Sequence, residues 1–232
     1  MARNYVFDPP QPSSIATAGS SQRFPVRRIY CVGRNYAEHV REMGNDPEKS
    51  LPFFFGKPAD AVVESGASIP YPASTSNFHH EIELVVAIGK GGSNVAVDHA
   101  LDHVWGYGVG IDLTRRDLQA TAKASGRPWD MAKGFDLSAP IAPLSAVSDC
   151  GHLAKGRIWL AIDGEIRQEA DISQMIWSVP EIISALSTQI SLRPGDIIMT
   201  GTPQGVGPIS PAQSITGGID GLIGININIT AA

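Results

Sequence analysis

Residues 79–88 read His-His-Glu-Ile-Glu-Leu-Val-Val-Ala-Ile, and their side chains alternate with the two-residue period of a β-strand. In such a strand Glu81 and Glu83 share one face with Val85 and Ala87, and the opposite face is aliphatic. At a rise of about 3.3 Å per residue, the two acidic residues lie about 6.6 Å apart. Both carboxylates can therefore reach one cation, although an isolated Glu-x-Glu pair is also typical of the solvated face of an amphipathic strand.

A third acidic residue, Asp112, ends the run Gly-Tyr-Gly-Val-Gly-Ile-Asp at residues 106–112. The same alternation places the three glycines on the face of Asp112, where we expect them to leave room for a ligand to approach the backbone. An all-oxygen ligand set favours Mg²⁺ or Mn²⁺, with Ca²⁺ as a further option, and argues against a structural zinc. We therefore predict a divalent-metal site formed by Glu81, Glu83 and Asp112.

The length and composition of the chain fit one globular catalytic domain. The chain has 232 residues, of which 43% are hydrophobic and 18% charged. We expect an N-terminal arm at residues 1–24, with a short edge strand at 5–7, and a catalytic domain at 25–232. The formal charge of −5 argues against nucleic-acid or acidic-membrane partners. Two cysteines without metal-ligand spacing indicate free thiols and a cytoplasmic location, and no apolar run approaches the length of a membrane span.

Strand-like runs separated by glycine and proline dominate the chain. The expected strands are residues 28–32, 53–55, 81–88, 104–111, 157–162, 165–168, 197–200 and 222–229. The expected helices are residues 36–43, 115–125, 173–177 and 179–188. These helices are too few and too irregularly spaced for a doubly wound parallel sheet. The pattern predicts the α+β class, as a β-rich roll of mixed sheets with short helices around the metal site.

The helix expected at residues 36–43 carries a candidate catalytic pair. We expect Asn35 to cap its N-terminus with Glu38 as the capping-box partner. His39 and Glu42 are then three residues apart on one face, so that the carboxylate can orient the imidazole as a general base. An ordinary solvated pair is the alternative interpretation.

Three further groups are candidates for contacts to substrate. Arg116 and Gln119 lie three residues apart on the helix that follows Asp112, and Lys133 is an additional cation nearby. Thr202 lies in a glycine-rich loop at residues 201–207 that lacks the ending of a phosphate-binding loop. We expect this loop to present the Thr202 hydroxyl and backbone N–H groups to a carboxylate. The sequence motifs of serine hydrolases, zincins and zinc ribbons are absent from the chain.

Taken in order, these segments resemble the fumarylacetoacetate hydrolase family. The matching stretches are residues 30–36 with His39 and Glu42, 53–58, 80–84, 112–119, 133–136 and 193–207. The resemblance runs from about residue 27 to residue 224. One departure is Pro-Ala-Gln-Ser at 211–214, which replaces the Pro-Gly-Asp-like turn of relatives.

The resemblance implies a β-rich roll, a homodimer, and a His39–Glu42 dyad on a lid that orders over substrate. It also implies an Mg²⁺ or Mn²⁺ ion and the remaining site residues: Glu81, Glu83 and Asp112 as metal ligands, Lys133 as a catalytic residue, and Arg116, Gln119 and Thr202 as substrate-binding residues.

The implied reaction is hydrolysis of a carbon–carbon bond in a 2,4-dioxo acid, which would chelate the ion through its carboxylate and 2-oxo group. His39, held by Glu42, would activate a water for attack on C4. Lys133 would stabilise the enolate that leaves as the C3–C4 bond breaks.

Within the family, residues 23–30 and 176–179 are similar to members that act on fumarylpyruvate, an intermediate of aromatic (gentisate) catabolism. Fumarylpyruvate is therefore the expected substrate, and its distal carboxylate needs a further cation, for which Arg34, Arg41 and Lys123 are unassigned candidates. The alternatives are acylpyruvate hydrolysis, oxaloacetate decarboxylation, isomerisation of a hydroxydiene dioate, and a non-catalytic binding protein stabilised by Ca²⁺.

Overall fold

The computed structural model describes residues 4–42 and 51–232. Its largest element is an eight-stranded sheet, whose strands in spatial order are β4 (Phe53–Lys57), β3 (Arg28–Gly33), β15 (Asp196–Met199), β8 (Ile82–Ile88), β9 (Val104–Ile111), β11 (Ala139–Ile141) and β5 (Val62–Glu64), with β12 (Ser145–Ala146) also paired to β9. Strands β8 and β9 form a long antiparallel pair near the middle of this sheet. They are the two strands predicted to bring the acidic residues together.

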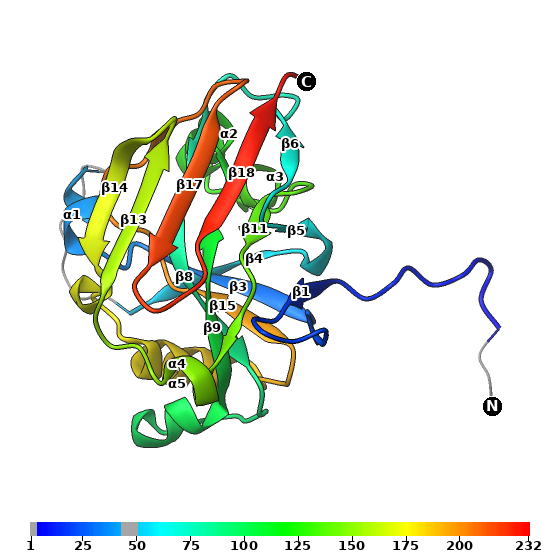
Figure 1. The fold of residues 1–232 in the computed structure, drawn as a ribbon, viewed down its shortest axis with the longest axis vertical. Coiled ribbons are helices and arrows are strands. Elements are labelled where there is room, and N and C mark those ends of the chain that lie inside the picture. Colours follow the sequence, from blue (N-terminus) through cyan, green and yellow to red (C-terminus); the bar gives the residue numbers. More distant parts are fainter. Residues whose placement is uncertain (1–3, 43–50) are drawn as a thin grey trace.

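Three smaller sheets accompany the large one, and the five-stranded sheet lies in front of it in Figure 1. A five-stranded sheet has the order β14 (Glu165–Asp171), β13 (Arg157–Ile162), β17 (Ser214–Ile219), β18 (Ile225–Thr230) and β6 (Ser68–Pro70). A three-stranded sheet contains β10 (Thr114–Arg115), β7 (Phe78–His80) and β16 (Gly207–Pro208), and a hairpin contains β1 (Ser14–Ala16) and β2 (Arg23–Pro25). The pairs β15–β3, β11–β5 and β18–β6 are parallel and the other pairs are antiparallel, so the sheets are mixed.

Strand β8 is buried along its whole length because it lies between two hydrophobic cores. Leu84 and Val86 pack in the larger core with aliphatic residues of the five-stranded sheet. Val85 and Ala87 pack in the smaller core, which the β1–β2 hairpin helps to cover. The predicted alternation is therefore confirmed, but the face that carries the acids is dry rather than solvated.

The helices are short and lie at the edges of the sheets. They are α1 (Ala37–Glu42), α2 (Arg116–Ala124), α3 (Asp130–Lys133), α4 (Val147–Cys150) and α5 (Val179–Gln189), with 3-10 turns η1 (Ala59–Ala61), η2 (Val97–His103) and η3 (Ile172–Gln174). Helix α5 begins with a capping box in which Ser178 N donates to Glu181 Oε2 at 2.8 Å. Within the described residues, no helix has the length and hydropathy needed to cross a bilayer.

The predicted α+β roll of mixed sheets is confirmed, with three local differences. The helix expected at 173–177 is only the 3-10 turn η3, because the backbone leaves the helical conformation at Met175, where ψ is 134°. The last strand begins at Ile225 rather than at residue 222, after the turn that precedes it. The edge strand expected at 5–7 is wrong: residues 4–13 form no strand and extend away from the body of the molecule (Figure 1).

The remainder of the N-terminal segment packs closely on the large sheet. Ile15 and Phe24 of the β1–β2 hairpin are 1% and 7% exposed and belong to the smaller core. A boundary between arm and catalytic domain at residue 24 stays a prediction, but the hairpin on its N-terminal side contributes to the core.

Candidate active site

The three acids meet where β8 begins and β9 ends. Glu83 lies opposite Gly110 in the antiparallel pair, and Asp112 N donates to Glu81 O at 2.8 Å just beyond it. One carboxylate oxygen from each of Glu81, Glu83 and Asp112 lies within 4.8 Å of the others. All three side chains are buried. The three carboxylates therefore converge on one point, as a shared cation site requires.

Buried cations surround this acidic cluster. Lys133 Nζ lies 2.8 Å from Glu81 Oε2 and 2.6 Å from Asp112 Oδ2. Lys57 Nζ lies 2.8 Å from Asp112 Oδ1, and Arg116 forms an ion pair with Glu81. Two of the three carboxylates, those of Glu81 and Asp112, are thus paired with three cationic side chains. Buried charges require such partners, because an unpaired charge is costly to bury.

Lys57 was not predicted as a site residue, although the sequence holds a signal for it. In β4 the two-residue period places Phe53, Phe55 and Lys57 on one face, and both phenylalanines line the pocket described below. A lysine that continues an aromatic face toward an acidic cluster is an ion-pair candidate. Its Nζ also donates to Leu113 O at 3.2 Å, so the ammonium group is enclosed by oxygen acceptors.

The acids differ in their electrostatic surroundings. Burial alone would raise the pKa of Glu81, but Lys133 and Arg116 outweigh it and hold that pKa well below its usual range. Burial raises the pKa of Glu83 well above its usual range, and the neighbouring charges of Asp112 and Glu81 add to the rise. No lysine or arginine in the described part of the chain forms an ion pair with Glu83, which instead accepts a hydrogen bond from Gly201 N at 2.7 Å.

The residues of this cluster fit a divalent metal ion. Asp112 Oδ1 is buried and accepts no hydrogen bond within residues 4–42 and 51–232, although Lys57 lies close to it. Glu83 and Asp112 would repel each other in a dry site without a further cation, since burial and the Asp112 charge both oppose ionisation of Glu83. Carboxylate oxygens are the ligands that hard divalent cations prefer. The acidic cluster can therefore hold such an ion.

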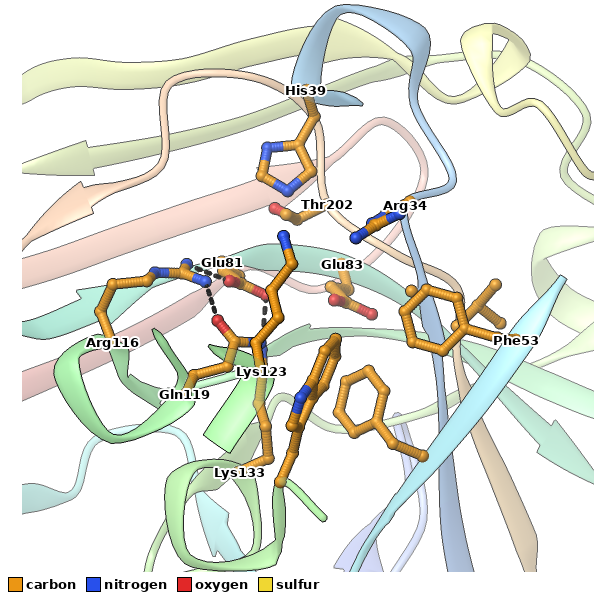
Figure 2. A pocket seen from close by; sticks show the side chains of 14 residues that line it. Arg34, His39, Phe53, Glu81, Glu83, Arg116, Gln119, Lys123, Lys133 and Thr202 are labelled. Atoms are coloured by element: carbon orange, nitrogen blue, oxygen red, sulfur yellow. Dashed lines mark hydrogen bonds and ion pairs between the residues drawn. The ribbon is translucent and has the colours of Figure 1, made fainter. Parts of the chain in front are cut away.

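A histidine faces the acids from the opposite side of the pocket (Figure 2). His39 Nδ1 lies 3.3 Å from Glu42 Oε2, so the structure brings the expected pair together. His39 is 7% exposed, and its ring points toward the acidic residues. Residues 43–50, which the expected helix enters and into which an expected lid would extend, lie outside the described residues.

The glycine-rich loop after β15 fixes this pair. Gly205 N lies 3.2 Å from both carboxylate oxygens of Glu42. Gly205 has a φ of +87°, and a Cβ at this position would lie 2.0 Å from Arg167 O, so only glycine fits. The loop presents the backbone N–H groups of Gly201 and Gly205 to Glu83 and Glu42 of the chain itself, and the expected contact of the loop to a carboxylate of a ligand stays a prediction.

The predicted N-cap at Asn35 is wrong. The Asn35 amide nitrogen donates to Trp177 O at 2.9 Å and to Thr200 O at 2.8 Å, and its oxygen accepts from Trp177 N. Glu38 forms an ion pair with Arg41 on the surface. Asn35 thus ties the segment before α1 to the end of β15, a long-range role that the local sequence pattern could not reveal.

Glu81, Glu83 and His39 line a common pocket (Figure 2). Its walls contain Val32, Gly33, Arg34, His39, Phe53, Phe55, Glu81, Glu83, Arg116, Gln119, Lys123, Trp129, Lys133 and Thr202. Every predicted site residue belongs to this wall except Asp112, which is held beneath it by Lys57 and Lys133, and Glu42, which contacts His39. Arg116 donates to Gln119 Oε1 and so is held beside it.

The expected role of the glycines in β9 is wrong. A Cβ on Gly106 would lie 2.3 Å from Ser145 O, and one on Gly110 would lie 2.6 Å from Val85 Cγ2. These glycines therefore admit the neighbouring strand and core side chains rather than a ligand. The open side of the acidic cluster faces His39 instead.

Gln168, on β14, was also missed. Its amide nitrogen donates to Thr202 Oγ1 at 2.8 Å and to Pro203 O at 2.9 Å, and its oxygen accepts from Ile82 N at 3.0 Å. This fully buried amide joins the start of β8 to the Thr202 loop. It lies 86 positions from Ile82 in the chain, so no local pattern could have indicated the contact.

Comparison with known proteins identifies the family. The fumarylacetoacetate (FAA) hydrolase C-terminal family matches residues 28–222. The chain belongs to the fumarylacetoacetate hydrolase family. The resemblance found in the sequence motifs is thereby confirmed.

Relatives within the fumarylacetoacetate hydrolase family carry several activity names. A crystallised fumarylpyruvate hydrolase from Pseudomonas aeruginosa, in complex with Mn²⁺ and pyruvate, is 53% identical and has a TM-score of 0.97, covering 99% of this chain and 100% of its own. A mitochondrial oxaloacetate tautomerase from Arabidopsis thaliana is 44% identical over 205 residues, 87% of this chain and 90% of its own. A mitochondrial oxaloacetate decarboxylase from Dictyostelium discoideum is 43% identical over 197 residues, 84% of this chain and 90% of its own.

Proposed function

We propose that this chain is a metal-dependent hydrolase that cleaves the C3–C4 bond of a 2,4-dioxo acid, with fumarylpyruvate as substrate and fumarate and pyruvate as products. The observation that carries the proposal is the His39–Glu42 pair facing the acidic cluster across one pocket. Such a pair supplies the base that a hydrolase needs. The 53% identity to a fumarylpyruvate hydrolase over nearly the whole chain supports the choice of substrate.

Glu81, Glu83 and Asp112 would hold the metal ion, for which Mg²⁺ and Mn²⁺ are the first candidates and Ca²⁺ a further one. A divalent ion bound there would act as a Lewis acid toward the oxygens of the oxo acid. Arg116 and Gln119, which contact each other, would bind the substrate carboxylate, and the Thr202 hydroxyl would contribute a further hydrogen bond.

His39 would act as the general base. With Glu42 holding its Nδ1, the free Nε2 takes a proton from a water, and the resulting hydroxide adds to C4 of the substrate. When the C3–C4 bond breaks, its electron pair moves into the enolate of pyruvate, and C4 becomes the carboxyl group of fumarate. The protonated His39 then returns its proton to C3. One water is consumed, and one molecule each of fumarate and pyruvate is formed.

Lys133 would stabilise the negative charge that develops on the enolate oxygen. Its ammonium group is fully buried, and contact with Asp112 and Glu81 raises its pKa despite the opposing effect of burial. Lys133 therefore stays charged at neutral pH and donates hydrogen bonds. A cation fixed in a site that contains little water stabilises a developing negative charge more strongly than the same cation does in solvent.

Oxaloacetate is the second candidate substrate, since relatives of 43–44% identity are named for its tautomerisation and decarboxylation. These reactions need an enolate but no attacking water. Acetylpyruvate hydrolysis and isomerisation of a hydroxydiene dioate are further variants on the same site.

A substrate screen separates these possibilities. Fumarylpyruvate, acetylpyruvate and oxaloacetate are each incubated with the enzyme and Mg²⁺ or Mn²⁺, and the products are separated by chromatography. We expect fumarate and pyruvate in equal amounts from fumarylpyruvate. Conversion of oxaloacetate alone would contradict the hydrolase assignment.

The homodimer, the cytoplasmic location and a place in aromatic catabolism also stay predictions. The free thiols of Cys31 and Cys150 are compatible with a reducing compartment. Sedimentation equilibrium of the purified protein would test the dimer directly.

A further inference from the structure

Two cationic side chains at the pocket have no acidic partner among residues 4–42 and 51–232. Arg34 and Lys123 both line the cavity, and in the parts of the chain that the structure describes neither forms an ion pair. This separates them from the inner cations Lys57, Lys133 and Arg116, each of which contacts Glu81 or Asp112. At the acidic end of the pocket each cationic side chain is thus paired with a carboxylate. Arg34 and Lys123, in contrast, leave positive charge available to a ligand.

Arg34 enters the pocket from the end of β3, on the side opposite Arg116 and Gln119 (Figure 2). Its φ is +58°, a left-handed conformation that is uncommon for a residue other than glycine and costs free energy. The guanidinium group lies 5.8 Å from the centre of the Phe53 ring, within the range of a cation–π contact. Arg34 is exposed to solvent, but this contact places its guanidinium group beside the wall of the pocket.

Lys123 approaches the pocket from α2. It is four residues after Gln119 and seven after Arg116, so all three side chains share one face of the helix. Figure 2 shows its amine extending toward the side of the pocket occupied by His39 and Thr202. Arg41, a third cation considered from the sequence, pairs with Glu38 and does not line the pocket.

Three aromatic rings form an apolar wall beside Arg34. The Trp129 ring lies 5.4 Å from the Phe53 ring at 85° and 5.5 Å from the Phe55 ring at 58°. All three rings line the cavity. A flat, unsaturated carbon chain fits such a wall, because it buries apolar area without requiring hydrogen bonds.

We propose that Arg34 and Lys123 bind the distal carboxylate of a dicarboxylic dioxo acid while the Phe53–Phe55–Trp129 wall holds its unsaturated segment, which makes them specificity-determining residues. The inference rests on the proposed hydrolase function. In this arrangement the first carboxylate of fumarylpyruvate lies at Arg116 and Gln119, and its C4 atom lies beneath His39. The three bonds beyond C4 then run along the aromatic wall toward Arg34. The cations thus distinguish fumarylpyruvate from acylpyruvates that end in a methyl group.

The experiment compares fumarylpyruvate with acetylpyruvate in the Mn²⁺-loaded enzyme and in the variants Arg34→Gln, Lys123→Gln and the double variant. Losing a charged hydrogen-bond partner should lower kcat/KM for fumarylpyruvate about 10- to 100-fold per residue. Most of the loss should be in KM. The loss for acetylpyruvate should be at least about tenfold smaller, because that substrate has no distal charge to lose.

Two variants serve as controls. Arg34→Lys keeps the charge and should recover part of the fumarylpyruvate activity that Arg34→Gln loses. Arg41→Gln removes a cation of α1 that lies outside the pocket, and it should not change the preference between the two substrates.

The outcomes separate the inference from the proposed function. Equal losses for both substrates, or no loss for fumarylpyruvate, would overturn the assignment of Arg34 and Lys123 while leaving the hydrolase intact. A wild-type enzyme that hydrolyses neither dioxo acid would overturn both.

Discussion

Asp112 is held between two buried lysines, with Oδ1 2.8 Å from Lys57 and Oδ2 2.6 Å from Lys133. Such an arrangement is stable only while every charge has a partner. The sequence predicted Asp112 and Lys133 from their motifs, but it did not connect Lys57 to them. Ion pairs between strands distant in the chain depend on the fold, and β4 reaches β9 only through the intervening strands of the large sheet.

Replacing Lys57 with methionine should destabilise the metal-free protein by about 3 kcal/mol, since it removes one partner of a buried ion pair. The loss should be smaller with saturating Mn²⁺, because the added cation compensates the Asp112 charge. Urea unfolding in EDTA and in Mn²⁺ measures both values. Arg167→Met, which breaks an exposed pair with Glu165, should cost less than about 1 kcal/mol under either condition. An equal loss for Lys57→Met in both buffers would show that no cation binds beside Asp112.

His39→Ala should lower kcat by about 10²- to 10⁴-fold, the usual contribution of a general base. Mn²⁺ affinity should change little, because His39 is not among the acidic ligands. Glu42→Gln keeps the size of the partner and should have a smaller effect. Steady-state kinetics and calorimetric Mn²⁺ titration test these expectations, and a His39→Ala enzyme with wild-type turnover would remove the pair from the mechanism.

At the scale of elements, the two-residue period predicted β8 and β9 well, and β9 and β13 have the predicted bounds. Periodicity succeeded because these strands lie between packed layers, where the identity of each face is enforced by burial. It failed for Asn35 and for the glycines of β9, whose partners are far away in the sequence. Turn and cap motifs indicate which hydrogen bonds a side chain can form with its neighbours in the sequence. Contacts with residues far away in the chain can replace these local hydrogen bonds.

The position of α2 depends on Asp117, which accepts hydrogen bonds from Thr75 Oγ1 at 2.6 Å and from Ser76 N and Leu118 N at 2.9 Å. Burial alone would raise the pKa of Asp117, but these hydrogen bonds outweigh it and lower that pKa below its ordinary value. A depressed pKa in the folded state means that the carboxylate stabilises the protein above its ordinary pKa. This contribution is lost as the pH falls through the folded-state pKa.

We therefore expect Asp117→Asn to lower the stability by about 1 kcal/mol at pH 7, with the difference from wild type shrinking below about pH 4. Thermal unfolding followed by circular dichroism between pH 7 and pH 2.5 measures this trend. Asp98→Asn is the matched control, because Asp98 is exposed and accepts no hydrogen bond in the described chain. A difference that stays constant with pH would contradict the charge-based explanation.

At the scale of the whole molecule, the mixed sheets bring together residues from β3, β4, β8, α1, α2, α3 and the loop after β15 around one pocket. The residue types and the metal triad could be predicted from ordered motifs. The aromatic wall and Gln168 could not, because they depend on how the sheets close around the acids. Arg34 was one of three candidate cations, and only the fold separates it from Arg41, which lies outside the pocket wall. We expect the carboxylates of Glu81, Glu83 and Asp112 to hold a divalent ion that is required for carbon–carbon bond cleavage.

This requirement is measured by titrating Mn²⁺ into EDTA-treated, dialysed enzyme and following the release of fumarate from fumarylpyruvate at each step. We predict negligible release without metal and full activity at one equivalent of Mn²⁺ per chain, with Asp112→Asn remaining inactive at that concentration. Full fumarate release by the metal-free enzyme, or wild-type activity in Asp112→Asn at one equivalent of Mn²⁺, would show that the three carboxylates do not hold a required ion.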